Sequence, residues 1–193
     1  MLVSVILSYL LGSVPSGVIA GKVKGKNIRR LGSGNIGTAN AARVLGMPMA
    51  LAVLFSDALK GFLAVYLGWW LGGTSTAAVL AAIAAICGHN WSLFLGFKGG
   101  KGVATSFGAC LALSPAWALS LAAIWAVVVA VTRYSSVGSL LAAGAAPIIA
   151  VVLRLGWSVF FFGLVGGILV IYRHQGNIKR LRSGTELRIG DRF

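Results

Sequence analysis

The sequence predicts an all-α integral membrane protein: a bundle of seven transmembrane helices with the N-terminus outside and the C-terminus inside. Apolar residues make up 58% of the chain and charged residues only 10%, and the mean hydropathy is +0.91, which does not describe a water-soluble domain. Apolar segments of membrane-spanning length recur along the chain, so residues 1–193 are expected to form one membrane-embedded domain. The 17 basic and 3 acidic residues concentrate in segments that this topology places in the cytoplasm.

The first predicted span is Met1–Gly21, because about 20 apolar residues cross the hydrocarbon layer as a helix. Pro15 is expected to kink it. The next segment, Lys22–Arg43, contains six basic residues and no acidic one, which favours the cytoplasmic side. Five further spans of full length are expected, at Met47–Leu71, Thr76–Leu95, Pro115–Val131, Val137–Leu153 and Trp157–Tyr172.

A short apolar segment, Val103–Leu113, lies between two of these spans. Eleven residues rise only about 16 Å as an α-helix, roughly half of a bilayer. The total of seven spans therefore depends on counting this short helix as a full crossing. Ser114 and Pro115 predict the start of the next helix, with serine as the N-cap.

The short helix follows a glycine-rich basic loop, Phe97–Thr105. Glycines let backbone N–H groups turn toward an anion, and the helix N-terminus adds a positive dipole end. The loop is not a Walker motif, because Leu95 and Gly102 stand where that motif needs glycine and Ser or Thr. The alternative is a turn whose two lysines face anionic lipid. The candidate phosphate-binding residues are Lys98, Gly99, Gly100, Lys101, Gly102 and Thr105.

A second polar loop, Leu31–Asn40, combines glycines with short hydroxyl and amide side chains. Such a composition suits a tight turn, but the density of donors near Arg43 also suits a phosphate or an oxyanion. The candidate site residues in this loop are Ser33, Gly34, Asn35, Gly37, Thr38 and Asn40.

Two more polar segments lie on the predicted cytoplasmic side. The turn Thr132–Ser139 is basic and rich in hydroxyl groups, and we expect Ser139 to help hold phosphate. The tail after Arg173 is polybasic, but a lipid anchor would need only its charges, whereas His174 and Asn177 suit a functional site.

Asp57 and Lys60 stand three residues apart inside a predicted span. Ionisable residues in a membrane are costly and often functional, but these two can neutralise each other, so the restrained interpretation is a salt bridge that pins neighbouring helices. The only other acids are Glu186 and Asp191. So few carboxylates disfavour a carboxylate metal centre or a paired-carboxylate hydrolase, and neither a metal nor a cofactor is expected. Nucleic acid is not expected as a partner, because the basic residues are divided among short loops.

These segments also carry a family resemblance. Three stretches resemble, in order, the cytoplasmic motifs of the bacterial acyl-phosphate-dependent glycerol-3-phosphate acyltransferases, PlsY. They are Gly32–Gly37 with Asn40, His89–Thr105, and Arg173–Glu186 with His174 and Asn177. Two local departures are Thr38-Ala39, where the family more often has Ala-Thr, and Ser92, where it often has Pro.

The resemblance implies transfer of a fatty acyl group from a long-chain acyl phosphate to the 1-hydroxyl of glycerol 3-phosphate. The products are lysophosphatidic acid and phosphate, in the first acylation of phospholipid biosynthesis at the bacterial inner membrane. It implies that the Gly99–Gly102 loop binds glycerol 3-phosphate. Glu186 is implied to be structural, and the protein is expected to act as a monomer. Of the residues that match the motifs, those expected to act in catalysis are Ser33, Arg43, Lys101, His174 and Asn177.

Two other classes of function compete with this interpretation. A transporter or exchanger of a small organic phosphate would also use helix N-termini and basic loops, but no inverted repeat is visible and the charges lie on one side of the membrane. A non-catalytic lipid-binding scaffold would not require Ser33, His174 and Asn177 beside the cations.

Overall fold

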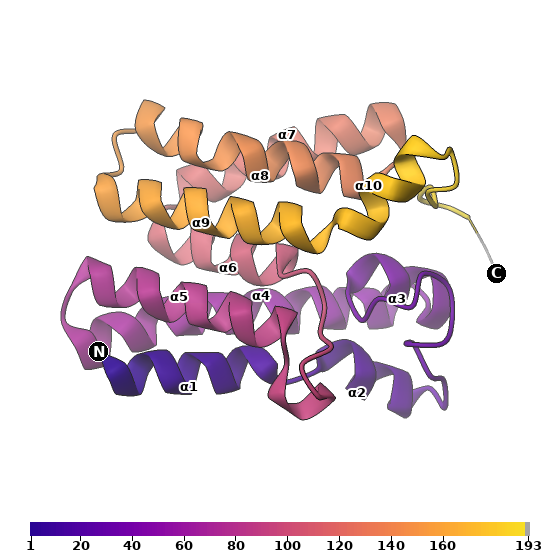
Figure 1. The fold of residues 1–193 in the computed structure, drawn as a ribbon, viewed down its shortest axis with the longest axis horizontal. Coiled ribbons are helices and arrows are strands. Elements are labelled where there is room, and N and C mark those ends of the chain that lie inside the picture. The colour runs from indigo at the N-terminus through magenta and orange to yellow at the C-terminus, as the bar shows by residue number, and fades with distance from the viewer. Residues whose placement is uncertain (192–193) are drawn as a thin grey trace.

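The computed structural model describes residues 1–191, and the regular secondary structure in this part of the chain is all helical (Figure 1). The elements in chain order are α1 (Leu2–Ser13), α2 (Ser16–Val23), α3 (Thr38–Leu45), α4 (Met47–Gly72), α5 (Ser75–Asn90), the 3-10 turn η1 (Leu93–Leu95), α6 (Val103–Leu113), α7 (Pro115–Thr132), α8 (Ser135–Val152), α9 (Trp157–Arg173) and α10 (Gln175–Arg182).

Five of the described helical segments are long and apolar enough to cross a membrane. They are Leu2–Val23, Met47–Gly72, Ser75–Leu95, Pro115–Thr132 and Ser135–Val152. A sixth is counted if α9 and α10, which are bent by 56° at their junction, form one span. The expected total of seven spans, six of full length and one short, is not reached by this measure, because α6 has only 11 residues and α9, with 17, is counted only together with α10.

The outer surface of the bundle is apolar, whereas its interior is built from small side chains. Trp70 and Trp157 are 81% and 83% exposed, and α5 buries six alanines and one glycine among its sixteen residues. A water-soluble protein would bury such large apolar side chains. In a membrane, lipid covers them, and small residues let helices approach closely. The fold is therefore that of an integral membrane protein.

Glycines set the closest helix contacts. A Cβ added at Gly61 in α4 would lie 1.8 Å from the Thr105 carbonyl oxygen in α6, and one at Gly108 would lie 1.8 Å from the Ala58 oxygen. A Cβ at Gly12 in α1 would lie 2.0 Å from a backbone oxygen of α5. No side chain fits in these spaces, so these glycines bring the helix backbones into contact.

Several helix boundaries follow the local chemistry of the sequence. Pro15 separates α1 from α2, so the helix is interrupted at the predicted kink, although the two helices form one candidate span. The short helix α3 ends at Leu45, and Gly46, which follows it, has a φ of +88°. The Ser114 hydroxyl accepts a 3.3 Å hydrogen bond from the Trp117 N–H at the start of α7, as the N-cap prediction requires. Pro147 lies within α8 without ending it.

Candidate active site

The polar segments meet at one end of the bundle. Figure 1 shows α3 and α10 toward the end of the bundle opposite the N-terminus, and the loop before α6 at the end of α5 that is nearer to them. The charges of Arg43, Lys101, His174 and Glu186 lie close enough together to interact. These four residues and Asn177 are called the polar cluster below.

Asn40 organises the first polar loop. Its side-chain oxygen accepts the Ser33 N–H at 2.9 Å, and its amide nitrogen lies within hydrogen-bond distance of the carbonyls of Ile28, Leu31 and Asn35. The side chain is only 1% exposed. Because these bonds occupy the whole amide, the geometry favours a role in positioning Ser33 over the direct substrate contact that we expected for Asn40.

The rest of this loop leads into α3. Gly34 has a φ of +71°, a left-handed conformation that favours glycine. Asn35 packs against Gly37, where an added Cβ would lie 3.1 Å from the Asn35 amide nitrogen. The Thr38 hydroxyl is buried and has no partner among residues 1–191. Ser33, Asn35 and Thr38 are thus placed at the N-terminal end of α3.

Arg43, one helical turn and a half further along α3, reaches the C-terminal segment. It donates to the carbonyls of Leu187 at 3.1 Å and Arg188 at 3.3 Å. Its Nε is buried and lacks a partner in the described part of the chain. Burial lowers the Arg43 pKa, although the charge of Glu186 opposes this effect. An anion at this position would satisfy the free N–H.

The glycine-rich loop before α6 differs from the predicted anion nest in one respect. The Gly99 N–H donates to the Asn90 carbonyl at 3.2 Å, and the Gly100 N–H donates to the His89 carbonyl at 2.9 Å. These two N–H groups hold the loop to the end of α5, so they are not available to an anion. The backbone donors suited to a ligand are instead those of the first turn of α6, which have no acceptor within the helix.

The other loop residues occupy different environments. Lys98 is exposed. Gly102 has a φ of +77° and turns the chain into α6. Thr105 is completely buried, and its carbonyl oxygen packs against Gly61 in α4. Of the loop side chains predicted to bind phosphate, the structure brings Lys101 to the polar cluster.

Lys101 begins a chain of hydrogen bonds. Its Nζ donates to the Asn177 side-chain oxygen, and the Asn177 amide donates to Glu186. Glu186 also accepts from Arg180 at 2.8 Å and from Ser136 at 2.8 Å. Glu186 is thus paired with Arg180, and the carboxylate fixes the Asn177 amide so that its oxygen faces Lys101.

The causes of the pKa shifts differ between Lys101 and Glu186, the two ends of this series of hydrogen bonds. Burial lowers the pKa of Lys101 to about 8, although the charge of Glu186 opposes the shift. For Glu186, burial raises the pKa, but the hydrogen bonds from Asn177, Ser136 and Arg180 outweigh it and the net shift is downward. Glu186 therefore stays ionised at neutral pH, whereas Lys101 is a cation that an arriving anion would stabilise.

His174 stands at the junction of α9 and α10 and is 2% exposed. Its Nδ1 lies 2.7 Å from the Val170 carbonyl oxygen. Because a carbonyl can only accept, Nδ1 carries the proton in the neutral ring, and Nε2 keeps its lone pair. This tautomer suits a general base.

Ser139 does not take the position that we expected. Its hydroxyl donates to the Ser135 carbonyl in its own helix at 2.9 Å. Ser136, one turn earlier, instead joins the polar cluster through Glu186. The sequence showed hydroxyl groups in this turn, but not which of them faces the cluster. Ser136 and Arg180 are the residues that sequence reasoning did not assign.

The Asp57–Lys60 ion pair is confirmed, with 2.6 Å between Nζ and Oδ1 and both side chains nearly inaccessible. Lys60 also donates to the Val14 carbonyl at the break between α1 and α2. The pair therefore ties α4 to the end of α1.

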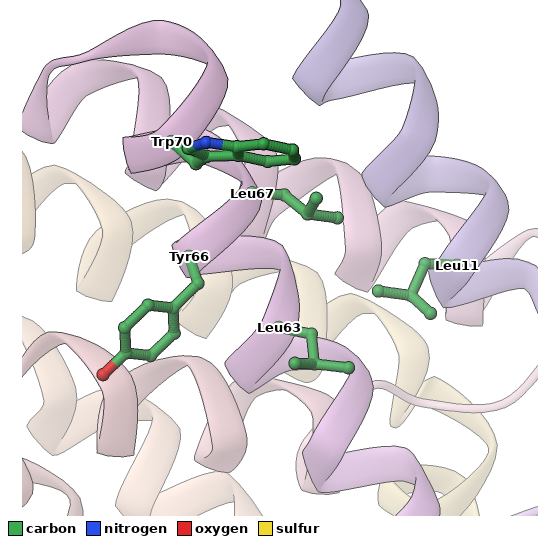
Figure 2. Close-up of a pocket in the computed structure, with 5 residues that line it drawn as sticks. All are labelled: Leu11, Leu63, Tyr66, Leu67 and Trp70. Carbon is green, nitrogen blue, oxygen red and sulfur yellow. The ribbon is translucent and has the colours of Figure 1, made fainter.

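A cavity of about 500 Å³ lies between α1 and α4, apart from the polar cluster. Figure 2 shows its five lining residues, Leu11, Leu63, Tyr66, Leu67 and Trp70. They are apolar or aromatic and include no residue of the polar cluster, so the candidate active site is the polar cluster and not this cavity.

Comparison with known proteins shows the family to which the chain belongs. The family model described as glycerol-3-phosphate acyltransferase matches residues 2–184. Glycerol-3-phosphate acyltransferase 2 of Moorella thermoacetica is 47% identical over 99% of this chain and 98% of its own length. The glycerol-3-phosphate acyltransferase of Gloeobacter violaceus is 46% identical over 95% of this chain and 92% of its own.

Two crystal structures of PlsY, an integral membrane glycerol 3-phosphate acyltransferase, share the fold. The glycerol 3-phosphate form has a TM-score of 0.93 and 40% identity, covering 98% of this chain and 95% of that one. The lysophosphatidic acid form has a TM-score of 0.91 and 39% identity over the same shares. The chain therefore belongs to the glycerol-3-phosphate acyltransferase family that includes PlsY.

Proposed function

We propose that the protein transfers a fatty acyl group from a long-chain acyl phosphate to the 1-hydroxyl of glycerol 3-phosphate, giving lysophosphatidic acid and inorganic phosphate. The observation that carries this proposal is the polar cluster itself. A partly desolvated Lys101, a buried Arg43 with a free N–H and a neutral His174 meet at one end of an apolar bundle. Both substrates are anions, so cations that hold them together offset their repulsion.

In this proposal Lys101 and the first turn of α6 hold the phosphate of glycerol 3-phosphate. Arg43, with the Ser33 loop and the start of α3, holds the phosphate of the acyl donor. The glycerol hydroxyl oxygen attacks the acyl carbon, the bond from that carbon to the phosphate oxygen breaks, and phosphate leaves with the electron pair. Backbone N–H groups stabilise the tetrahedral oxyanion.

The hydroxyl proton goes either to Nε2 of His174 or to the phosphate of the donor. Replacing His174 by Ala separates these routes. If His174 is the base, turnover at saturating substrates falls by roughly 10²–10⁴-fold, the usual contribution of a general base. Near-normal turnover would assign the proton to the donor phosphate. The matched His174→Gln variant tests whether hydrogen bonding alone supports the reaction.

Acyl phosphate is an activated donor whose leaving group needs little protonation. The few carboxylates of the chain are therefore no obstacle to the chemistry.

The proposal includes seven crossings, with α6 as the short one, and a polar cluster on the cytoplasmic side of the inner membrane. It takes the protein to act as a monomer. The basic composition of Lys22–Arg43, the loop before α6 and the tail supports the cytoplasmic placement.

A direct assay tests the proposal. Purified protein in lipid vesicles receives acyl phosphate and glycerol 3-phosphate, and lysophosphatidic acid and phosphate are measured. Equal amounts of the two products support the proposal. Movement of glycerol 3-phosphate across sealed vesicles without product would favour the transporter alternative.

A further inference from the structure

The Gly99–Gly100 segment is fully committed to the protein. Its two N–H groups donate to the Asn90 and His89 carbonyls, as described above. Its two carbonyl oxygens accept from Arg173, with Nε 2.9 Å from the Gly100 oxygen and a terminal nitrogen 3.1 Å from the Gly99 oxygen. All four backbone polar groups of these glycines are thus bonded, although such groups in exposed loops usually bond to water.

His89 lies against one side of this segment. A Cβ added at Gly100 would lie 2.2 Å from His89 Nε2, so the imidazole occupies the space that a side chain would need. The other ring nitrogen, Nδ1, lies 3.7 Å from Asp57 Oδ1. Lys60 holds Asp57 and also bonds the Val14 carbonyl. The imidazole ring therefore lies against a fixed ion pair inside the bundle.

Arg173, at the end of α9, binds the same segment. Its guanidinium lies 5.5 Å from the centroid of the Trp91 ring, a cation–π distance, while two of its nitrogens are used by the glycine carbonyls. Arg173 immediately precedes His174 in the chain, yet its planar fork is directed at the loop. Two helices, α5 and α9, thus hold the same two glycines.

We propose that Arg173 and His89 are positioning residues that fix the Gly99–Gly100 segment between them and so set Lys101 at the phosphate of glycerol 3-phosphate. Lys101 is the next residue after Gly100, and its amine must reach Asn177 and the ligand together. A shift of about 1 Å in such a group can cost 10²-fold in rate or affinity. This inference rests on the proposed function of Lys101.

The test is Arg173→Lys, which keeps the charge but loses the planar pair of bonds. Steady-state kinetics should show KM for glycerol 3-phosphate raised about tenfold or more, with kcat and KM for acyl phosphate within about twofold, the pattern of lost uniform binding. The rise in melting temperature that glycerol 3-phosphate induces should shrink at equal ligand concentration. Arg154→Lys, an exposed arginine at the opposite end of the bundle, is the matched control.

Each other outcome is decisive. Unchanged KM in Arg173→Lys, or a lower kcat with unchanged KM, overturns the inference, since the second result would place Arg173 in the chemical step. If Arg173→Lys does not fold, the same kinetics are measured on His89→Gln. An unchanged KM for glycerol 3-phosphate in that variant also overturns the inference. A wild-type protein without product or ligand-induced stabilisation would contradict the proposed function, whereas a normal wild type beside an unaltered variant contradicts only the positioning role.

Discussion

The buried Lys101 amine predicts that substrate binding depends on pH. Burial lowers its pKa to about 8, so the amine loses its charge at a lower pH than an exposed lysine. Glycerol 3-phosphate is already a dianion there, because its second phosphate pKa is about 6. We expect KM for glycerol 3-phosphate to be lowest near pH 7 and to rise by up to about tenfold per pH unit above the Lys101 pKa.

Lys101→Arg is the matched control, because arginine stays charged throughout this range. Its KM, whatever its value at pH 7, should stay constant between pH 7 and 9.5 in the same kinetic assay. A wild-type KM that is flat over this interval would contradict the assignment of Lys101 as the cation that binds the phosphate.

A pair of serines tests the geometry of the α8 turn. Ser136 bonds Glu186, whereas Ser139 bonds its own helix. We expect Ser136→Ala to raise KM for glycerol 3-phosphate a fewfold. A hydrogen bond to a charged group is worth about 1.5–3 kcal/mol, but its loss at Glu186 affects Lys101 only indirectly, through Asn177. Ser139→Ala should leave both KM values unchanged. If instead Ser139→Ala raises KM and Ser136→Ala does not, the result would support the expectation from the sequence that Ser139 helps hold phosphate.

At the scale of elements, helix ends were predictable because they depend on neighbouring residues. Val103 and Leu113 bound α6 as expected, and Ser114 caps α7. The contacts of the glycine-rich loop were not predictable in this way. Whether Gly99 and Gly100 bind an anion or the end of α5 depends on how closely α5 approaches, which no local pattern records.

The α4–α6 contact gives a prediction about stability. Gly108→Ala places a Cβ 1.8 Å from the Ala58 carbonyl oxygen, so the helices must separate, and overpacking of this kind costs about 1–3 kcal/mol. Thermal unfolding in detergent should show a lower melting temperature.

Gly144→Ala in α8 is the control for this change. A Cβ there meets nothing within 4 Å, and alanine favours a helix over glycine by about 0.5–1 kcal/mol. Its melting temperature should equal or exceed that of the wild type. Equal destabilisation by both variants would refute the role of close packing between α4 and α6.

At the scale of the whole molecule, charge and hydropathy predicted the membrane class and the gathering of the polar segments at one end of the bundle. Composition could not predict that Arg43 reaches the carbonyls of Leu187 and Arg188, some 144 residues away. It also could not fix the number of crossings, because α6 is shorter than a bilayer.

The topology is testable with single cysteines in a background without Cys87 and Cys110. Lys98→Cys should react with an impermeant maleimide only from the cytoplasmic side, because its loop precedes α6 beside the polar cluster. Arg154→Cys, between α8 and α9, should react only from outside. Labelling of both positions from one side would exclude an odd number of crossings between them.

The most direct measurement of the central claim is product formation by the wild type and Lys101→Met in lipid vesicles. We predict equal yields of lysophosphatidic acid and phosphate from acyl phosphate and glycerol 3-phosphate in the wild type. In the variant, kcat/KM for glycerol 3-phosphate should fall about 10–100-fold, the loss expected for one charge-assisted hydrogen bond. No product in the wild type, or an unchanged kcat/KM in the variant, would contradict the account.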